Sequence, residues 1–342
     1  MAELGTVAVA GSAPAGRQWL STIARQRELT LLGIMIVLGA GVSLMAPQFL
    51  TVDNLTQVAV LASVTAVAAV GEALVVITRG IDLSVEAMIG LVAYAVARTL
   101  ELHALDPVAA IAMGLALGLV LGMINGVVVT LLKVPAIVAT LGTLSIFRGI
   151  DYLVAGPHQV PLAGLPPGFT DPAASDIFGV PWFVLVTVVI VSLGSVYLRS
   201  TRFGRQVYAV GSNPEAAAIM GIPSRLVTFT AFSACGLLAG VAGVMWVMEF
   251  GTTNGTAADG TSLAVIAAVV VGGVSTLGGS GTLVGAALGA LFLGFIANAL
   301  ILVGLSQFWL QAIYGVVILV AISGDAVIRH SFRRATTRSA AR

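Results

Sequence analysis

The stretch Arg199–Arg225 reads RSTRFGRQVYAVGSNPEAAAIMGIPSR, a polar interruption between two apolar runs that are each long enough to cross a bilayer. Asn213 and Pro214 read as a helix start, because proline suits the first helical position. Glu215 suits the positive end of the helix dipole, and Gly221 is a typical helix stop. The stretch therefore predicts a short helix of about two turns between two membrane spans.

The composition is that of a protein that crosses a membrane several times. Hydrophobic residues make up 58% of the 342 positions, charged residues make up 9%, and the mean hydropathy is +1.06. Soluble domains have about 25% charged residues, so this chain has too few for a water-exposed surface. We predict an all-α polytopic fold of about ten transmembrane helices. The predicted spans are 29–46, 56–78, 84–102, 107–132, 134–154, 181–198, 226–249, 261–277, 282–303 and 307–324.

The basic residues indicate which side of the membrane each connection faces. With the N-terminus in the cytoplasm, every Lys and Arg except Arg98 and Arg148 falls on the cytoplasmic side, as the positive-inside rule requires. Ten spans place both termini on that side. The predicted organisation is an N-terminal tail over 1–28, a membrane domain over 29–324 and a basic C-terminal tail over 325–342. The polar segment 199–225 then faces the cytoplasm.

The longest predicted connection on the outer side, 155–180, is rich in proline and glycine and has only acidic formal charges. A segment of this composition cannot span the bilayer, since its backbone polar groups would stay unpaired there. Two interpretations stay open. The loop is either a simple connector or a rim that meets an extracytoplasmic substrate-binding protein.

Two stretches of the chain echo each other weakly. Residues 73–90 read ALVVITRGIDLSVEAMIG, and residues 267–285 read AAVVVGGVSTLGGSGTLVG. Each passes from an apolar run through glycine to serine and then into a helix of small residues. Duplicated halves with glycine-interrupted hydrophobic segments are typical of transporters, so the echo predicts a weak internal repeat.

Several polar side chains fall inside the predicted spans. Glu72 is a costly intramembrane carboxyl group that suggests a pathway or a proton relay, although no charge pair is evident within the spans. Asp82 or Ser84 is expected to cap the next helix, and capping is favoured over solute contact. The amides of Asn125 and Asn298 suit sugar hydroxyls and helix–helix bonds equally. The candidate residues of a substrate path are Glu72, Asp82, Ser84, Asn125, Thr140, Thr143 and Asn298.

The chain lacks the motifs of an ATPase and of an enzyme. Its only lysine, Lys133, is followed by Val-Pro, so there is no Walker phosphate loop. The single Cys235 and three widely separated histidines give no metal-ligand spacing. A transporter with neither a phosphate loop nor a charge relay must receive its energy from a partner chain. We therefore expect no cofactor or metal in this chain.

The spacing Gly-x-Asn-x-x-Ala-Ala-x-x-x-Gly-Ile over 211–222 resembles the coupling segment of ABC importer permeases, in the branch that takes up ribose, related monosaccharides and autoinducer 2. Arg79 departs from this family, which usually has a neutral residue before the following glycine. The similarity extends from about residue 50 to 325. Three further stretches resemble family segments, namely GIDLS at 80–84, KVPAIVATLGT at 133–143 and GGVSTLGGSGT at 272–282.

The resemblance implies that 199–225 is the coupling segment and that its short helix docks on a separate ABC ATPase, which binds ATP and Mg²⁺. The small side chains of the helix would let it enter a groove on that partner. It also implies a permease that moves a monosaccharide or similar polyhydroxylated solute inward by alternating access in a bacterial inner membrane. An extracytoplasmic binding protein and a second permease chain, identical or paralogous, would be partners, and nucleic acid would not. The implied coupling residues are Gly211, Asn213, Pro214, Glu215, Ala216, Ala217, Gly221 and Ile222.

Two other readings stay open, a self-contained ion-coupled secondary transporter and a membrane scaffold without transport activity. The first would need a charge relay inside the membrane, which the sequence does not display. Rhamnose, a ribose-like sugar and autoinducer 2 are the candidate solutes. Since tight binding would reside in the binding protein, the path is expected to be uncharged and lined by small residues, Ser, Thr, Asn and a few aromatics.

Overall fold

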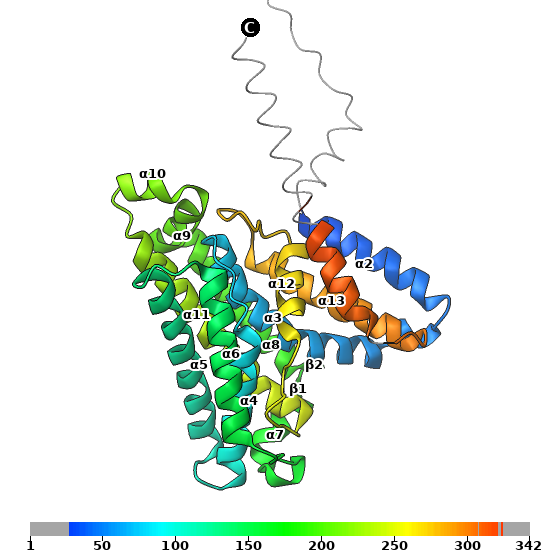
Figure 1. The fold of residues 1–342 in the computed structure, drawn as a ribbon. Coiled ribbons are helices and arrows are strands. Elements are labelled where there is room, and N and C mark those ends of the chain that lie inside the picture. Colours follow the sequence, from blue (N-terminus) through cyan, green and yellow to red (C-terminus); the bar gives the residue numbers. More distant parts are fainter. Residues whose placement is uncertain (1–26, 307, 321–322, 324–342) are drawn as a thin grey trace, which may run out of the picture.

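The computed structural model describes residues 27–306, 308–320 and 323, and this part of the chain is a bundle of helices (Figure 1). Of the tails predicted over 1–28 and 325–342, only Arg27 and Glu28 are described, and they already belong to the first helix. The elements are α2 (Arg27–Ser43), η1 (Pro47–Leu50), α3 (Val52–Ile77), α4 (Val85–Glu101), α5 (Pro107–Thr130), α6 (Ala136–Ala155), η2 (Leu162–Gly164), α7 (Pro167–Ala174), β1 (Asp176–Ile177), β2 (Val180–Pro181), α8 (Trp182–Ser200), α9 (Arg202–Ser212), α10 (Pro214–Ile219), α11 (Ser224–Phe250), α12 (Thr261–Val271) and α13 (Leu283–Leu302).

Helices occupy all ten segments that were predicted as spans, the last of them being Trp309–Val320. Six of these helices, α3, α5, α6, α8, α11 and α13, are long and apolar enough to cross a membrane. The chain is therefore a multi-pass membrane protein. Crossing by the other four helices, and with it the ten-span count and the position of both termini, stays a prediction.

The tightest helix pair is α5 with α11, and glycines make this close approach possible. Gly118 of α5 faces Gly236 of α11, where a Cβ on Gly118 would lie 2.5 Å from the Gly236 carbonyl oxygen. Gly122 repeats the arrangement one turn further along α5, 2.5 Å from the Phe232 carbonyl oxygen. Small residues spaced four apart allow helix backbones to touch in a membrane, where close packing replaces the hydrophobic effect as the driving force.

The helix α12 is shorter than the span predicted over 261–277. It has 11 residues and ends at Val271, before two glycines of which Gly273 has φ of +84°. Eleven residues rise about 16 Å, roughly half the thickness of the hydrocarbon core. The non-helical connection 251–260 that precedes it is partly buried by the bundle. Irregular backbone at this depth is tolerated because protein covers it.

The two ends of the bundle carry different structures. The short helices α9 and α10 lie at one end, and α7 lies at the opposite end (Figure 1). Next to α7, β1 and β2 form a two-residue antiparallel pair, with Asp176 opposite Pro181 and Ile177 opposite Val180. The connection predicted over 155–180 thus contains a helix and most of a small hairpin.

Candidate coupling surface and solute path

The coupling segment folds as two short helices, α9 and α10, as its capping residues dictate. The Thr201 hydroxyl caps α9 by accepting a hydrogen bond from the Gly204 N–H at 2.9 Å. Asn213 Oδ1 caps α10 by accepting from the Ala216 N–H at 3.0 Å. Gly221 follows α10 with φ of +73°, a conformation that glycine adopts without strain. The predicted short helix, its start and its stop are confirmed.

The C-terminal end of α10 presents two large apolar side chains outward. Ile219 is 86% exposed and Met220 is 79% exposed. Exposed apolar side chains on an otherwise polar segment indicate an interaction surface. Neither residue is among the coupling residues that the sequence implied. Their position at the C-terminal end of the short helix, directly before Gly221, was a signal that could have suggested them.

Ala217 does not belong to that surface. It is only 4% exposed and packs into the hydrophobic core of its own chain. Its side chain points inward, and a part for Ala217 in ATPase docking stays a prediction. Glu215 and Ala216 are exposed, and Pro214 and Ile222 are half-buried.

The end of α3, the end of α9 and the turn before α13 meet at one junction, which anchors α9 to the bundle. Arg79 donates from Nε to the Gly211 carbonyl at 2.6 Å and from Nη2 to the Ser212 carbonyl at 2.7 Å. A cation suits these positions because the carbonyls at a helix C-terminus carry partial negative charge. The Gly279 N–H donates to the Ile77 carbonyl at 2.9 Å. The arginine that departs from the family pattern thus holds the end of α9 in place.

The two echoing stretches, 73–90 and 267–285, meet at this junction through the Ile77–Gly279 bond. The Tyr208 hydroxyl of α9 also donates to the Gly281 carbonyl at 3.0 Å. Movement of α10 is therefore linked by short hydrogen bonds to the end of α3 and to the turn before α13. Whether the two stretches form a structural repeat stays a prediction.

Four of the predicted path residues form one fully buried polar cluster. Asp82 Oδ1 accepts from the Ser84 N–H at 2.9 Å and from the Ser84 hydroxyl at 2.6 Å. Asn125 Nδ2 donates to Asp82 Oδ2 at 2.9 Å and to the Ser84 hydroxyl at 2.7 Å. Glu72 Oε1 accepts from the Asp82 N–H at 3.0 Å. The cluster joins α3, the start of α4 and α5 from inside.

The predicted caps are corrected in part. Ser84 is the N-cap residue of α4, but its side chain accepts no hydrogen bond from the first turn, so a Ser84 cap is wrong. Asp82 accepts from the N–H of Ser84 itself, which fixes the chain at the point where α4 starts.

We expect Asp82→Asn to be mild and Asp82→Leu to be severe. The new amide oxygen still accepts from the Ser84 N–H and hydroxyl, and Asn125 Nδ2 keeps its hydrogen bond to the Ser84 hydroxyl, so only its bond to Asp82 Oδ2 is lost. The loss should be about 1 kcal/mol, one net hydrogen bond. Leucine would leave the donors of Ser84 and Asn125 unpaired, at about 1–3 kcal/mol each. Thermal unfolding of the purified permease measures both. Loss of transport in Asp82→Asn at normal stability would instead give Asp82 a direct role.

The other predicted path residues lie in two places. Thr140 is buried beside the polar cluster and donates to the Ile81 carbonyl at 3.0 Å, and Thr143 is buried one turn further on. Asn298 is remote from them and exchanges two amide hydrogen bonds with Asn54, each 2.9 Å long. Solute contact by any of the seven stays a prediction.

A charged network lies inside the bundle, contrary to the expectation of no intramembrane charge pair. The Arg148 guanidinium lies 2.6 Å from an Asp259 carboxylate oxygen and donates to the Ala257 carbonyl at 3.0 Å. It also lies 3.6 Å from Glu86 and 3.7 Å from Asp151. The network could not be predicted from the sequence, because its members come from α4, α6 and the connection before α12, which are far apart along the chain.

The network also anchors the start of the half-length helix α12. Glu86 Oε2 accepts from the Ser262 N–H at 3.1 Å, and the Ser262 hydroxyl donates to the Leu83 carbonyl at 2.7 Å. A carboxylate at this position is favoured by the helix dipole. The starts of α4 and α12 are thereby held together.

Both exceptions to the positive-inside rule are matched by acidic groups. Arg148 belongs to the charged network, and Arg98 forms an ion pair with Glu101. His158, in the connection after α6, lies 2.8 Å from the same Glu101 carboxylate and 3.1 Å from Arg98. Local neutralisation explains why these two arginines do not follow the charge rule.

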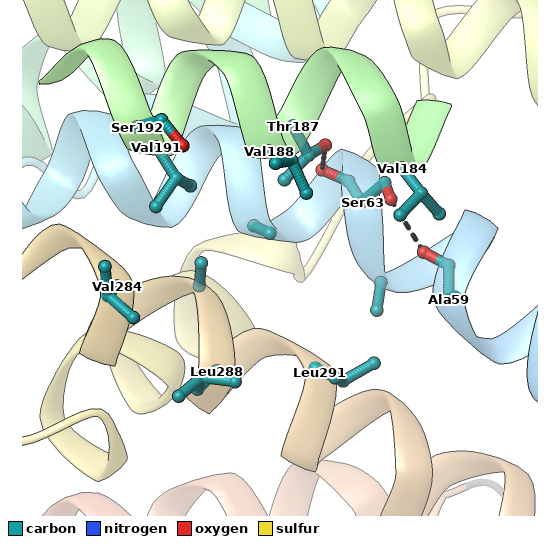
Figure 2. Close-up of a pocket in the computed structure, with 13 residues that line it drawn as sticks. Ala59, Ser63, Val184, Thr187, Val188, Val191, Ser192, Val284, Leu288 and Leu291 are labelled. Carbon is teal, nitrogen blue, oxygen red and sulfur yellow. Dashed lines mark hydrogen bonds between the residues drawn. The ribbon is translucent and has the colours of Figure 1, made fainter. Parts of the chain in front are cut away.

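One cavity of 350 Å³ lies between α3, α8 and α13 (Figure 2). Its lining is almost wholly apolar. The Ser63 hydroxyl already donates to the Ala59 carbonyl at 2.7 Å, and the Thr187 hydroxyl donates to the Ser63 carbonyl at 3.4 Å. It offers little to a polyhydroxylated solute.

Two other cavities share Phe250 in their linings. A cavity of 480 Å³ is bounded by α3, α7 and the end of α11, and its polar lining includes Gln57, Asp171 and Glu249. A cavity of 240 Å³ lies between α3, α11, α12 and α13, and Asn298 lines it. The other six predicted path residues line none of these three cavities. No group of three or more His, Cys, Asp or Glu in the described residues could hold a metal ion.

Residues 54–322 match the protein family described as branched-chain amino acid transport system / permease component. The chain is 36% identical over 315 residues to the autoinducer 2 import system permease protein LsrC of Escherichia coli O9:H4 (strain HS), covering 92% of this chain and 91% of that protein. It is 37% identical over 318 residues to LsrC of Salmonella typhi, covering 92% and 90%. No solved structure matches the chain.

The family match covers most of the chain, and the relatives match it over nearly their whole length. These relatives are named as permease components of import systems and not as enzymes. The apolar helices agree with that assignment. The chain therefore belongs to this family of transport permeases: it is the transmembrane permease subunit of an ABC importer whose ATPase is a separate chain.

Proposed function

We propose that this importer takes up autoinducer 2 or a chemically similar monosaccharide-like solute. The relatives at 36–37% identity are named for autoinducer 2 import, which supports this choice. The uncharged, partly aromatic lining of the 240 Å³ cavity suits a small neutral solute. Rhamnose and ribose are the next solutes to compare.

The proposed arrangement follows from the two unlike ends of the bundle. Figure 1 shows α9 and α10 at one end of the bundle and α7 at the other. In the proposed arrangement the first end faces the cytoplasm of a bacterium and the ATPase, and the second faces the extracytoplasmic binding protein. Ten spans in the inner membrane keep both tails on the cytoplasmic side. A second permease chain, identical or paralogous, completes the path, and ATP and Mg²⁺ bind to the ATPase.

The observation that carries the assignment of α10 to ATPase docking is the exposed pair Ile219 and Met220, on a helix that follows the anchored end of α9. A push on this pair would reach α3 through Arg79 and α13 through the turn at Gly279. A loop without such hydrogen bonds would move without displacing the membrane helices. The geometry therefore supports α10 as the element through which ATPase closure moves the spans.

An ion-coupled transporter is the second candidate, because the Arg148 network is the kind of intramembrane charge group that it needs. It would leave the exposed apolar tip of α10 without a role. Uptake by the purified permease alone under a proton or sodium gradient would favour it.

Replacing both Ile219 and Met220 with Asp should abolish ATPase binding. The two side chains are exposed, so their exchange leaves the fold intact, whereas two carboxylates would be buried at the interface without partners. We expect loss of ATPase co-purification and at least a tenfold fall in ATP-driven autoinducer 2 uptake in proteoliposomes.

Phe178→Asp is the matched control. Phe178 is a fully exposed apolar residue in the turn between β1 and β2, at the end of the bundle opposite α10. It should keep the ATPase bound. Normal ATPase co-purification with the double Asp variant would show that α10 is not the docking surface.

A further inference from the structure

Phe250, the last residue of α11, lines both the 480 Å³ and the 240 Å³ cavity. On the α7 side it borders the polar cavity, with Asp171 and Glu249. On the other side it borders the 240 Å³ cavity, which reaches Ala264 in the first turns of α12. The two cavities thus share one aromatic ring in their linings.

The 240 Å³ cavity combines aromatic faces with a few polar groups. The Trp246 and Phe250 rings lie 4.4 Å apart at an interplanar angle of 43°, and Tyr314 lines the cavity beside them. Ligand sites are mostly apolar and aromatic, with a small number of polar groups that orient the ligand. Drug-sized ligands take about 300–1,000 Å³, so 240 Å³ suits a smaller molecule.

The polar groups of this cavity are uncharged, and several are free to bind. Thr65 Oγ1, Trp246 Nε1 and Tyr314 Oη have no hydrogen-bond partner among the described residues, and Asn298 uses its amide on Asn54 alone. Among the described residues, no Asp, Glu, Lys or Arg lines the cavity. Hydroxyl, indole and amide groups can bond the hydroxyls of a neutral solute, while an ion would lack a counter-charge.

We propose that the cavity lined by Thr65, Trp246, Asn298 and Tyr314 holds the solute during transport. This inference rests on the proposed function and assigns the place in the chain where a neutral, polyhydroxylated small molecule is bound. The C–H face of the solute packs on Trp246, and its hydroxyls bond Thr65, Tyr314 and Asn298. Phe250 lies between this site and the 480 Å³ cavity, since it lines both.

Two alanines on α13 give a matched test, since each lines a different cavity. Ala297 lines the proposed solute cavity, and Ala287 lines the apolar cavity of Figure 2. Both are half-buried. Ala297→Phe should lower the initial rate of ATP-driven autoinducer 2 uptake at least tenfold while ATPase co-purification is kept, and Ala287→Phe should stay within twofold of the unchanged protein. Equal effects of the two variants would overturn the proposal.

Cysteine labelling tests the cavity without depending on the identity of the solute. In a Cys235→Ala background, Thr65→Cys should react with a membrane-impermeant thiosulfonate added from outside, and Ala297→Phe should slow that reaction at least tenfold. No labelling of Thr65→Cys would overturn the cavity as an outward-open site. Labelling without any autoinducer 2 uptake by the unchanged importer would overturn the proposed solute and keep the cavity.

Discussion

Gly211→Val is expected to abolish ATP-driven uptake while the permease still inserts into the membrane. A Cβ at Gly211 would lie 1.8 Å from the Ile77 carbonyl oxygen and 2.5 Å from the Gly279 nitrogen. Both neighbours are backbone atoms that bond each other, so neither can turn away as a side chain would. The junction must open, which costs about 1–3 kcal/mol for ordinary overpacking and releases α10 from α3.

We expect the rate of ATP-driven uptake to fall at least tenfold, and the stimulation of ATP hydrolysis by the solute-loaded binding protein to fall by a similar factor. Steady-state uptake and binding-protein-stimulated ATPase activity in proteoliposomes measure both. Gly33→Val is the control, because a Cβ at Gly33 in α2 meets nothing within 4 Å. If Gly211→Val transported as well as Gly33→Val, the junction would have no part in coupling.

Arg148→Met is expected to prevent accumulation of folded permease. The substitution keeps a long side chain and leaves Asp151, Glu86 and Asp259 without their cation. Asp151 is 0% exposed, and neither of its carboxylate oxygens has a hydrogen-bond partner among the described residues. Removing one partner of a buried ion pair destabilises a protein by about 3–5 kcal/mol, because the remaining charge stays buried. That amount is a large part of a typical folding free energy.

The measurement is the yield and thermal stability of the protein in detergent. Arg225→Met, which removes an exposed arginine at the start of α11, should behave as the unchanged protein. The double variant Arg148→Met with Asp151→Asn should recover part of the yield, since the most deeply buried charge is removed as well. Unchanged stability of Arg148→Met would mean that the carboxylates are neutral or hydrated in the membrane.

Local features of the chain were readable from the sequence. The short helix between two spans follows from Asn213, Pro214 and Gly221, which act on their immediate neighbours through caps and backbone angles. Helices at the ten predicted positions follow from apolar runs, because hydropathy is a property of each segment alone. Membership of the permease family rests on motifs of the same local kind.

Predictions failed where the outcome depended on which segments meet. Arg148 and the Ala257 carbonyl are 109 positions apart, and Asp82 and Asn125 are 43 apart. Neither pairing has a sequence signal, since each arises only when α6 packs near the connection before α12, or α5 packs against the start of α4. The polar residues expected to contact solute therefore include groups that hold helices together.

The packing of segments against each other also decided which way single side chains point. The sequence by itself determined that 214–219 is a helix of small residues, but only its packing on the bundle turned Ala217 inward and left Ile219 and Met220 exposed. The role of Arg79 likewise needed the end of α9 beside it. The physical reason is range: capping and hydropathy act within a few residues, whereas burial, ion pairing and close backbone approach exist only between elements that the fold brings together.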